Sequence, residues 1–130
     1  MTDCVFIENS ATYGAGGMGN SEGSSPHVTR CIFKGNSALY YGGAVGNWDD
    51  SRLVFRECVF SGNVAHLEGG AMSGHVGSGA TFENCVFSGN AADGLGGAVK
   101  NHGTALTLRN CTIHGNRSST ACGGVWSGGD

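Results

Sequence analysis

Three acidic residues have side chains and a spacing that a calcium site could use. Glu22 and Asp49 occupy the same position of a repeat of about 27 residues, and Asp50 follows directly. Carboxylate oxygens are preferred ligands of Ca²⁺, so these residues predict a calcium site if the fold brings them together. The alternative is a solvated acidic loop. The nearest basic residue in the sequence is Arg52.

Aromatic and imidazole side chains recur at the same offset. Trp48, His75 and His102 follow one another at the interval that separates Glu22 from Asp49. An exposed indole can stack on a sugar ring, and imidazoles on neighbouring structural units can bind a divalent metal. The opposite loop is a second candidate contact patch, with Tyr13, Tyr40, Tyr41 and Leu67. We interpret these residues as the candidate ligand-binding surface, with ordinary loop aromatics as the alternative.

The residues that could catalyse a reaction do not fall into a known arrangement. Ser, His and Asp are present, but none lies in a nucleophile-elbow pattern, and no shared offset brings the three together. Polysaccharide lyases and hydrolases need clustered acids with a base, whereas the ten acidic residues here are mostly scattered. We therefore expect no catalytic residue and no cofactor except calcium. A polysaccharide lyase or hydrolase is the enzymatic alternative.

The strongest regularity is a cysteine that returns at a nearly constant interval of about 27 residues. It occupies positions Cys4, Cys31, Cys58, Cys85 and Cys111. A fixed period of this length predicts stacked units that bury their apolar side chains against one another. We expect free thiols in one interior column, although neighbours about 4.8 Å apart could also form a disulfide. Cys122 lies outside this column.

Two further columns appear when the repeats are aligned on the cysteine. A phenylalanine stands two positions after each of the first four cysteines, and an asparagine stands five positions after all of them. Their members are Phe6, Phe33, Phe60, Phe87, Asn9, Asn36, Asn63, Asn90 and Asn116. Stacked phenyl rings would fill the core, and stacked amides would hydrogen-bond from turn to turn at corners where Asn tolerates a left-handed backbone. Both columns are predicted to be scaffold.

Apolar residues within each repeat alternate in steps of two, as in Leu53-x-Phe55 and Cys58-x-Phe60. This period indicates β-strands. Three short strands per repeat, separated by Gly and Asn corners, predict a coil in which each turn pairs in parallel with its neighbours. The expected fold is all-β: a single-stranded parallel β-helix, or β-solenoid, of about five turns, each of about 27 residues. Residues 1–130 are expected to form one domain.

Charge and hydropathy exclude several partners. The 130 residues have a formal net charge of −3 and no cluster of Lys or Arg, so we do not expect the chain to bind nucleic acid. No apolar stretch approaches the roughly 20 residues that a membrane helix needs, and the N-terminus lacks the segments of a signal peptide. We expect no membrane insertion.

Two short motifs resemble those of a known family. FxxN occurs at residues 6–9, 33–36, 60–63 and 87–90, and it is paired with GGAV at 42–45 and 96–99 and with GGAM at 69–72. The pairing resembles the repeats of chlamydial polymorphic membrane proteins over essentially the whole chain, although the first repeat has Gly16-Gly17-Met18 without the alanine. The resemblance implies a pectin-lyase-like β-helix and the role of a surface adhesin. A right-handed coil agrees both with the resemblance and with the preference for right-handed crossovers.

The repeat pattern contains no recognisable cap at either end. We therefore expect the ends to contact the rest of a longer β-helix or another copy of the chain. The main hypothesis is a non-enzymatic structural or adhesive segment of an extracellular or bacterial cell-surface protein that binds a glycan or a cell-surface protein. One alternative is a subunit that stacks end to end into an extracellular filament. The other is a polysaccharide-binding or lyase-like module.

Overall fold

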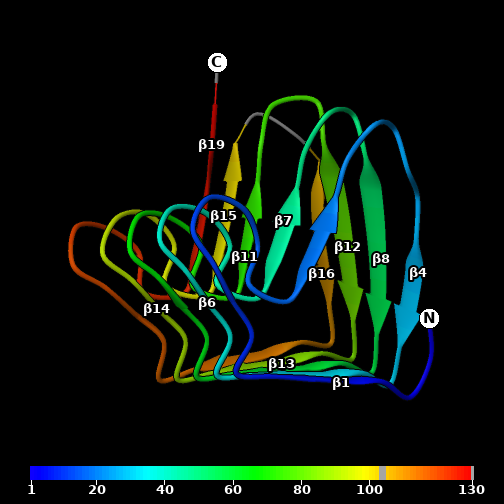
Figure 1. Ribbon diagram of the computed structural model, residues 1–130, viewed down its shortest axis with the longest axis horizontal. Helices are drawn as coiled ribbons and strands as arrows, with labels where there is room; N and C mark the ends of the chain where they lie inside the picture. The colour runs from blue at the N-terminus through cyan, green and yellow to red at the C-terminus, as the bar shows by residue number, and fades with distance from the viewer. Residues whose placement is uncertain (103–104, 130) are drawn as a thin grey trace.

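The chain is a coil of β-strands in the computed structural model, which describes residues 1–102 and 105–129. Each turn contributes strands to four parallel sheets, and equivalent strands of successive turns lie side by side (Figure 1). The pairing is parallel and in register, so Phe6 lies opposite Phe33, and Phe33 lies opposite Phe60. The chain is therefore an all-β parallel solenoid of about five turns, each of about 27 residues, as the sequence predicts.

The four sheets are numbered in chain order. Sheet 1 follows the cysteine column and contains β1 (Val5–Ile7), β5 (Ile32–Lys34), β9 (Val59–Ser61), β13 (Val86–Ser88) and β17 (Thr112–His114). Sheet 2 contains β2 (Ser10–Ala11), β6 (Ser37–Ala38), β10 (Val64–Ala65), β14 (Ala91–Ala92) and β18 (Arg117–Ser118). Sheet 3 contains β3 (Met18–Asn20), β7 (Val45–Asn47), β11 (Met72–Gly74), β15 (Val99–His102) and β19 (Val125–Gly128). Sheet 4 contains β4 (His27–Thr29), β8 (Arg52–Arg56), β12 (Gly79–Glu83) and β16 (Leu106–Arg109).

The number of strands per turn differs from the sequence-based expectation. The pattern predicts three strands per repeat, whereas the structure has four. The additional one is the two-residue strand of sheet 2, which forms because the chain resumes parallel pairing directly after the Asn corner. A two-residue strand is too short to show the alternation by which the other strands are recognised.

The interior is filled by side chains that pack against their own kind one turn away. Phe33 stacks on Phe60 with ring centroids 5.0 Å apart and planes inclined by 8°. Phe55 and Phe82 form a second stack at 5.1 Å, and this stack meets the first one edge to face. All four rings are fully buried. The predicted phenylalanine column is thus one half of a two-column aromatic core.

The asparagine column forms the predicted ladder. The left-handed residue at each corner, however, is the one before the asparagine, as in Gly35 and Gly62, each with a φ of 62°. The backbone N–H and the side-chain Nδ2 of Asn36 both donate to Oδ1 of Asn63, at 2.9 and 3.0 Å. The same Nδ2 donates to the carbonyl oxygen of Phe6 in the preceding turn at 2.9 Å. The amide-to-amide contacts continue from Asn9 to Asn116, and the three middle asparagines are fully buried. The ladder therefore satisfies amides that would each cost about 1 to 3 kcal/mol if they were buried without a partner.

The GGA steps let neighbouring turns approach closely. A Cβ at Gly43 would overlap the carbonyl oxygen of Gly70 in the next turn. Gly69 has a φ of 68°, and a Cβ there would overlap the carbonyl oxygen of Met72. These positions need glycine, because one lies too close to the next turn for a side chain and the other has a left-handed backbone. With glycine there, the chain can pass from its loop into sheet 3.

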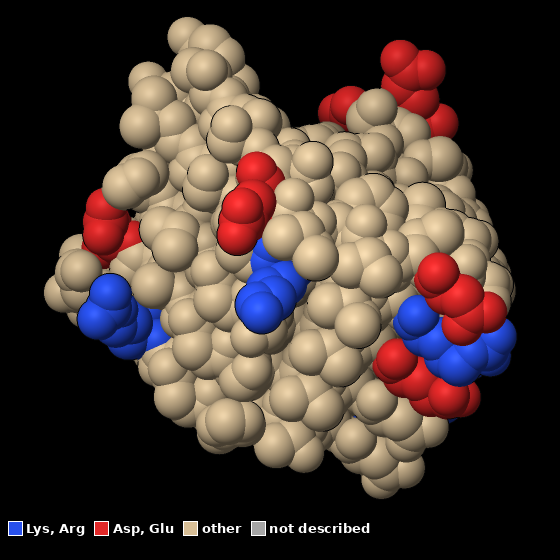
Figure 2. Space-filling view, turned by 60° about the horizontal axis from the view of Figure 1, so that its bottom comes forward, with Lys and Arg blue, Asp and Glu red and all other residues tan. Residues whose placement is uncertain are grey.

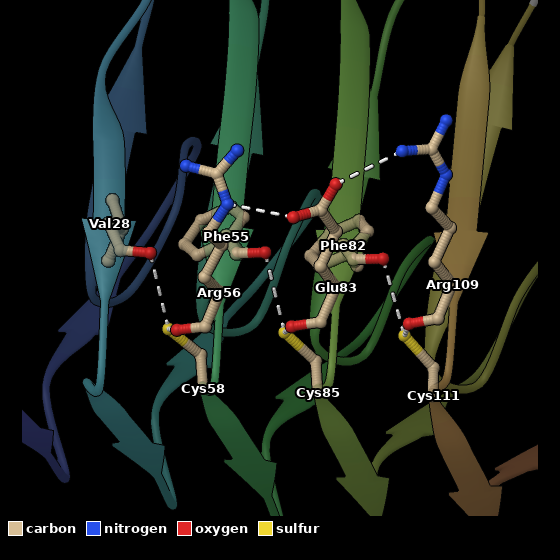
Figure 3. A network of polar contacts seen from close by, with 9 residues as sticks. All are labelled: Val28, Phe55, Arg56, Cys58, Phe82, Glu83, Cys85, Arg109 and Cys111. Carbon is tan, nitrogen blue, oxygen red and sulfur yellow. Dashed lines mark hydrogen bonds and ion pairs between the residues drawn. The ribbon is translucent and has the colours of Figure 1, made fainter.

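The cysteine column lies in the coil as free thiols. Sγ of Cys58 donates to the carbonyl oxygen of Arg56 at 3.2 Å and approaches that of Val28, one turn earlier, at 3.6 Å (Figure 3). Cys85 repeats this arrangement in the following turn. Burial raises the pKa of the Cys31 thiol, and a hydrogen bond with Cys58 together with burial raises the pKa of Cys85. The column is therefore scaffold made of free thiols, as the sequence predicts.

Charges of opposite sign alternate beside this column. Arg56 Nε lies 2.7 Å from one carboxylate oxygen of Glu83, and Arg109 Nη1 lies 3.3 Å from the other (Figure 3). The hydrogen bond from Arg56 lowers the pKa of the Glu83 carboxyl. Exposed pairs of this kind contribute at most about 1 kcal/mol each, so they favour the register without determining it.

Removing a middle rung of the asparagine ladder should destabilise the protein more than removing the first rung. Asn63→Ala deletes the acceptor of two Asn36 donors, and we expect the free energy of unfolding to fall by roughly 3 kcal/mol. Asn9→Ala deletes one donor, the side-chain Nδ2, and keeps the backbone N–H that also donates to Asn36, so we expect a loss of about 1 kcal/mol. Urea unfolding followed by circular dichroism measures both values. Equal losses would contradict the assigned role of the ladder.

Candidate functional site

Trp48 lies across the outer face of sheet 3. Its ring reaches over Gly46 of its own turn and Gly19 of the preceding turn. A Cβ at Gly46 would overlap Cη2 of Trp48, whereas a Cβ at Gly19 would lie 3.5 Å from the ring. The two glycines hold outward-facing positions of paired strands, so their missing side chains make room for the indole.

Trp48 belongs to a row of rings that touch one another. Tyr13 stacks on Tyr40 with ring centroids 5.1 Å apart, and Tyr40 lies 6.2 Å from Tyr41. Tyr41 meets His75 edge to face at 4.8 Å, and His75 lies 6.0 Å from Trp48. Further along the coil, His102 and Trp126 form a second pair of rings. We call the whole set the aromatic strip: Tyr13, Tyr40, Tyr41, Trp48, His75, His102 and Trp126.

Two sets of loops supply the aromatic strip. The tyrosines come from the loops between sheets 2 and 3, whereas Trp48 and His75 come from the turns between sheets 3 and 4. In Figure 1 the loops between sheets 2 and 3 lie at the left, and the turns between sheets 3 and 4 arch over the upper ends of the strands of sheet 3. Figure 2 shows a hollow between two lobes at the upper edge of the molecule. His102 ends β15 and meets Trp126 of β19 at 6.1 Å. The described residues enclose no pocket, so the strip is an open surface.

His75 lies at the centre of the strip and is kept neutral. Burial lowers the pKa of its imidazole, and the positive charge of Lys100 lowers it further. Glu68 and Asp49 act in the opposite direction without reversing the shift. Glu68 belongs to the loops that carry the tyrosines, and Asp49 belongs to the turn after Trp48. Carboxylates from both sets of loops thus act on the same imidazole.

A buried ion pair lies on the outer face of sheet 3, which also carries the Trp48 ring. Lys100 projects from the outer face of β15 but is only 3% exposed, and its Nζ lies 2.9 Å from a carboxylate oxygen of Glu68. Ser73 occupies the equivalent position of the preceding turn and is fully buried. Within the described part of the chain, Ser73 Oγ and His75 Nε2 are buried polar atoms without a hydrogen-bond partner. Ser73, Lys100 and Glu68 therefore form a polar layer on this face, which we call the floor of the strip. Its lysine is already paired with Glu68.

The predicted calcium ligands are exposed turn residues. Glu22 with Gly23, and Asp49 with Asp50, hold the central positions of four-residue turns that are closed by a backbone hydrogen bond. Their φ angles are 58°, 69°, 51° and 57°, as a type I′ turn requires, and Asp adopts this conformation more readily than most residues. In residues 1–102 and 105–129 no three His, Cys, Asp or Glu side chains lie close enough to hold a metal ion. The turn conformation gives Asp49 and Asp50 a structural role, and calcium binding by these exposed residues stays a prediction.

The structure brings the predicted ligand-binding residues together more closely than the sequence suggests. Tyr40 and Tyr41 form a separate patch in the sequence analysis, but Tyr41 contacts His75 and joins that patch to Trp48. Asp49 and Asp50 are exposed at the edge of the strip. The two candidate surfaces are therefore one.

Sequence reasoning missed the floor of the strip and a second amide ladder. Lys100 aligns with Ser73 at the repeat offset, so its outward position could have been found, but its burial could not. Asn20 Nδ2 donates to Asn47 Oδ1 at 2.8 Å, and Asn47 Nδ2 donates to the carbonyl oxygen of Gly79 at 2.9 Å. This second ladder is interrupted by Gly74, which hides it in the alignment.

The fold and its in-register columns define the structural class, a repeat protein whose parallel turns share one core. In a comparison with protein-family models, residues 1–130 match the right handed beta helix region. The chain belongs to this right-handed β-helix family. No curated protein and no solved structure is matched. The described residues also include no helix of the length and hydrophobicity that crossing a membrane requires.

Acidification should destabilise the protein through His75. Its folded pKa lies below the unfolded value of 6.5, so the neutral imidazole stabilises the fold above that pH, and this stability is lost as the pH falls below it. Between about pH 7.5 and about pH 5.5 we expect the unfolding temperature to fall by several degrees more in the wild type than in His75→Gln. His114→Gln is the control, because His114 is exposed at the end of β17. Identical pH profiles for wild type and His75→Gln would contradict the assignment.

Proposed function

We propose that this chain is a non-enzymatic adhesive segment of an extracellular or bacterial cell-surface protein, and that it binds a glycan along the aromatic strip. The observation that supports this proposal is the contact chain from Tyr13 to Trp48, which crosses from one set of loops to the other. Aromatic rings that are partly exposed offer apolar faces beside polar edges, which suits a sugar ring. Tyr13 is 73% exposed and offers such a face directly.

The strip runs along the coil and therefore suits an extended ligand. Its members come from successive turns, which lie about 4.8 Å apart. A polymer that lies along the coil can contact several rings at once, and linked weak contacts add up to useful affinity. An adhesin needs this kind of binding, because its target is a repetitive surface.

The reactive side chains have structural roles that agree with a binding module. The buried thiols donate to backbone carbonyls, and the acidic residues beside the strip hold turn conformations. The FxxN and GGA motifs resemble those of chlamydial polymorphic membrane proteins, whose repeats build surface adhesins. The polysaccharide-degrading alternative predicts that the bound glycan is cleaved, so the binding experiment also tests it.

Binding should depend on the position of the Trp48 ring. Gly46→Ala places a methyl group where the indole lies, so we expect it to displace the ring and to weaken glycan binding by about tenfold, or about 1.4 kcal/mol. Gly19→Ala is the matched control, because its methyl group would make an ordinary contact with the same ring. A glycan array identifies the ligand, and titration calorimetry with wild type, Trp48→Ala and both glycine variants measures the affinities. A blank array for the wild type would overturn the proposal, and released sugar products would favour the enzymatic alternative.

End-to-end assembly is a second candidate, because the asparagine ladder has a direction. Each asparagine donates to the Oδ1 of the next turn, so Asn9 Oδ1 receives no donor from the described residues. At the other end, no described acceptor takes the Asn116 backbone N–H. A further β-helical turn, from a longer chain or from a second copy, would continue the ladder with the same bonds.

Assembly of copies should be visible by electron microscopy. If a second copy continues the ladder, the pure protein should form filaments as its concentration rises, and Asn9→Ala should form fewer. Sedimentation provides the quantitative measurement. A uniform monomer population at every concentration would count against a filament and would leave the longer β-helix as the ladder's continuation.

A further inference from the structure

The exposed charges beside the aromatic strip are predominantly acidic. Glu22, Asp49 and Asp50 are exposed at the turns between sheets 3 and 4. Asp50 extends toward the following turn, where a Cβ at Gly77 would overlap its Oδ1. The acidic side chains at the upper right of Figure 2 have no Lys or Arg beside them in that view. The turns thus present carboxylates along one edge of the strip.

Among the described residues, two basic residues lie near the strip, and only one of them is exposed. Lys100 is 3% exposed, and its ammonium group is paired with Glu68. Arg52 is exposed, but it begins β8 and lies along sheet 4, where its Nη1 would be 3.3 Å from a Cβ at Gly79. An acidic polysaccharide would therefore meet more carboxylates than cations, since Lys100 is paired and Arg52 lies along sheet 4.

The same arrangement suits a cation. The faces of Trp48 and the tyrosines attract positive charge through their π-electrons, and this attraction grows where water is partly excluded. Asp49 and Asp50 lie in the turn that directly follows Trp48, so exposed carboxylates adjoin the aromatic strip. In the outward row of sheet 3, Ser73 Oγ is fully buried and has no hydrogen-bond partner among the described residues.

We infer that the aromatic strip selects a cationic glycan, namely an oligosaccharide of amino sugars with free ammonium groups. This inference rests on the proposed glycan-binding function and specifies its ligand class. The sugar rings stack on the aromatic faces, while the ammonium groups lie between the rings and the carboxylates of Asp49 and Asp50. The strip is therefore selective against polyuronates, although both ligands offer similar ring faces.

Three matched oligosaccharides test the inference by titration calorimetry at neutral pH and low salt. They are a fully deacetylated glucosamine oligomer, its N-acetylated form and a galacturonate oligomer of equal length. We expect the deacetylated oligomer to bind at least about tenfold more tightly than the N-acetylated one, with no measurable binding of galacturonate. Its affinity should fall as salt is added, because salt screens the carboxylates.

Charge-neutral variants identify the residues responsible. Asp49→Asn combined with Asp50→Asn should remove most of the preference for the deacetylated oligomer and should leave binding of the N-acetylated oligomer unchanged. Asn also tolerates the left-handed backbone of this turn, so the variant should fold, as circular dichroism can verify. Glu57→Gln is the control, because it removes one charge at the corner before sheet 1, away from the strip.

The outcomes separate this inference from the proposed function. If the N-acetylated or the galacturonate oligomer binds as tightly as the deacetylated one, the strip binds glycans and the inference is wrong. The same conclusion follows if the double variant keeps the full preference. If none of the three oligomers binds and the glycan array is also blank, the proposed function and the inference both fail.

Discussion

Parallel, in-register stacking is the constraint on which the rest of this structure depends. Each interior side chain lies against the equivalent side chain of the neighbouring turn, as Phe33 does against Phe60. A residue at an interior position must therefore pack well against a copy of itself. Flat rings satisfy this condition by stacking, and asparagine satisfies it because its amide both donates and accepts. The condition is repeated in every turn, which explains why the sequence returns to the same residues at the same offset.

This constraint explains how much of the fold could be predicted from the sequence. The period, the phenylalanine and asparagine columns and the parallel pairing all follow from residues that must match one turn away. The interior position of the cysteine column followed as well, although the sequence left the choice between thiols and disulfides open. The fourth sheet did not follow, since a two-residue strand such as Ser37–Ala38 contains no alternation. The ladder from Asn20 to Asn47 was also missed, because Gly74 interrupts it at the next turn.

The outer surface is harder to predict because it is free of this constraint. The sequence indicated Trp48, His75, Tyr40 and Tyr41 as surface candidates, but as two separate patches. The two patches are joined by the contact between Tyr41 and His75. These residues come from different loops and do not occupy the same position of the repeat, so the alignment of repeats does not bring them together. The burial of Lys100 depends likewise on Glu68, which lies on the opposite set of loops. Contacts between loops follow from the shape of each turn, and a repeat period contains no information about them.

The aromatic strip nevertheless depends on the scaffold beneath it. Parallel strands place the outward position of each turn directly beside the next, so Gly19, Gly46, Ser73 and Lys100 form one row. The first two residues of this row are small enough to admit the Trp48 ring, whereas the later ones provide the hydroxyl and the ammonium group of the floor. The coil thus gives every turn the same backbone, and variation at a single outward column determines where a ring can lie and where a charge is buried. The repeat therefore fixes where the side chains of this face lie, and the residues that differ from one repeat to the next determine its shape and charge.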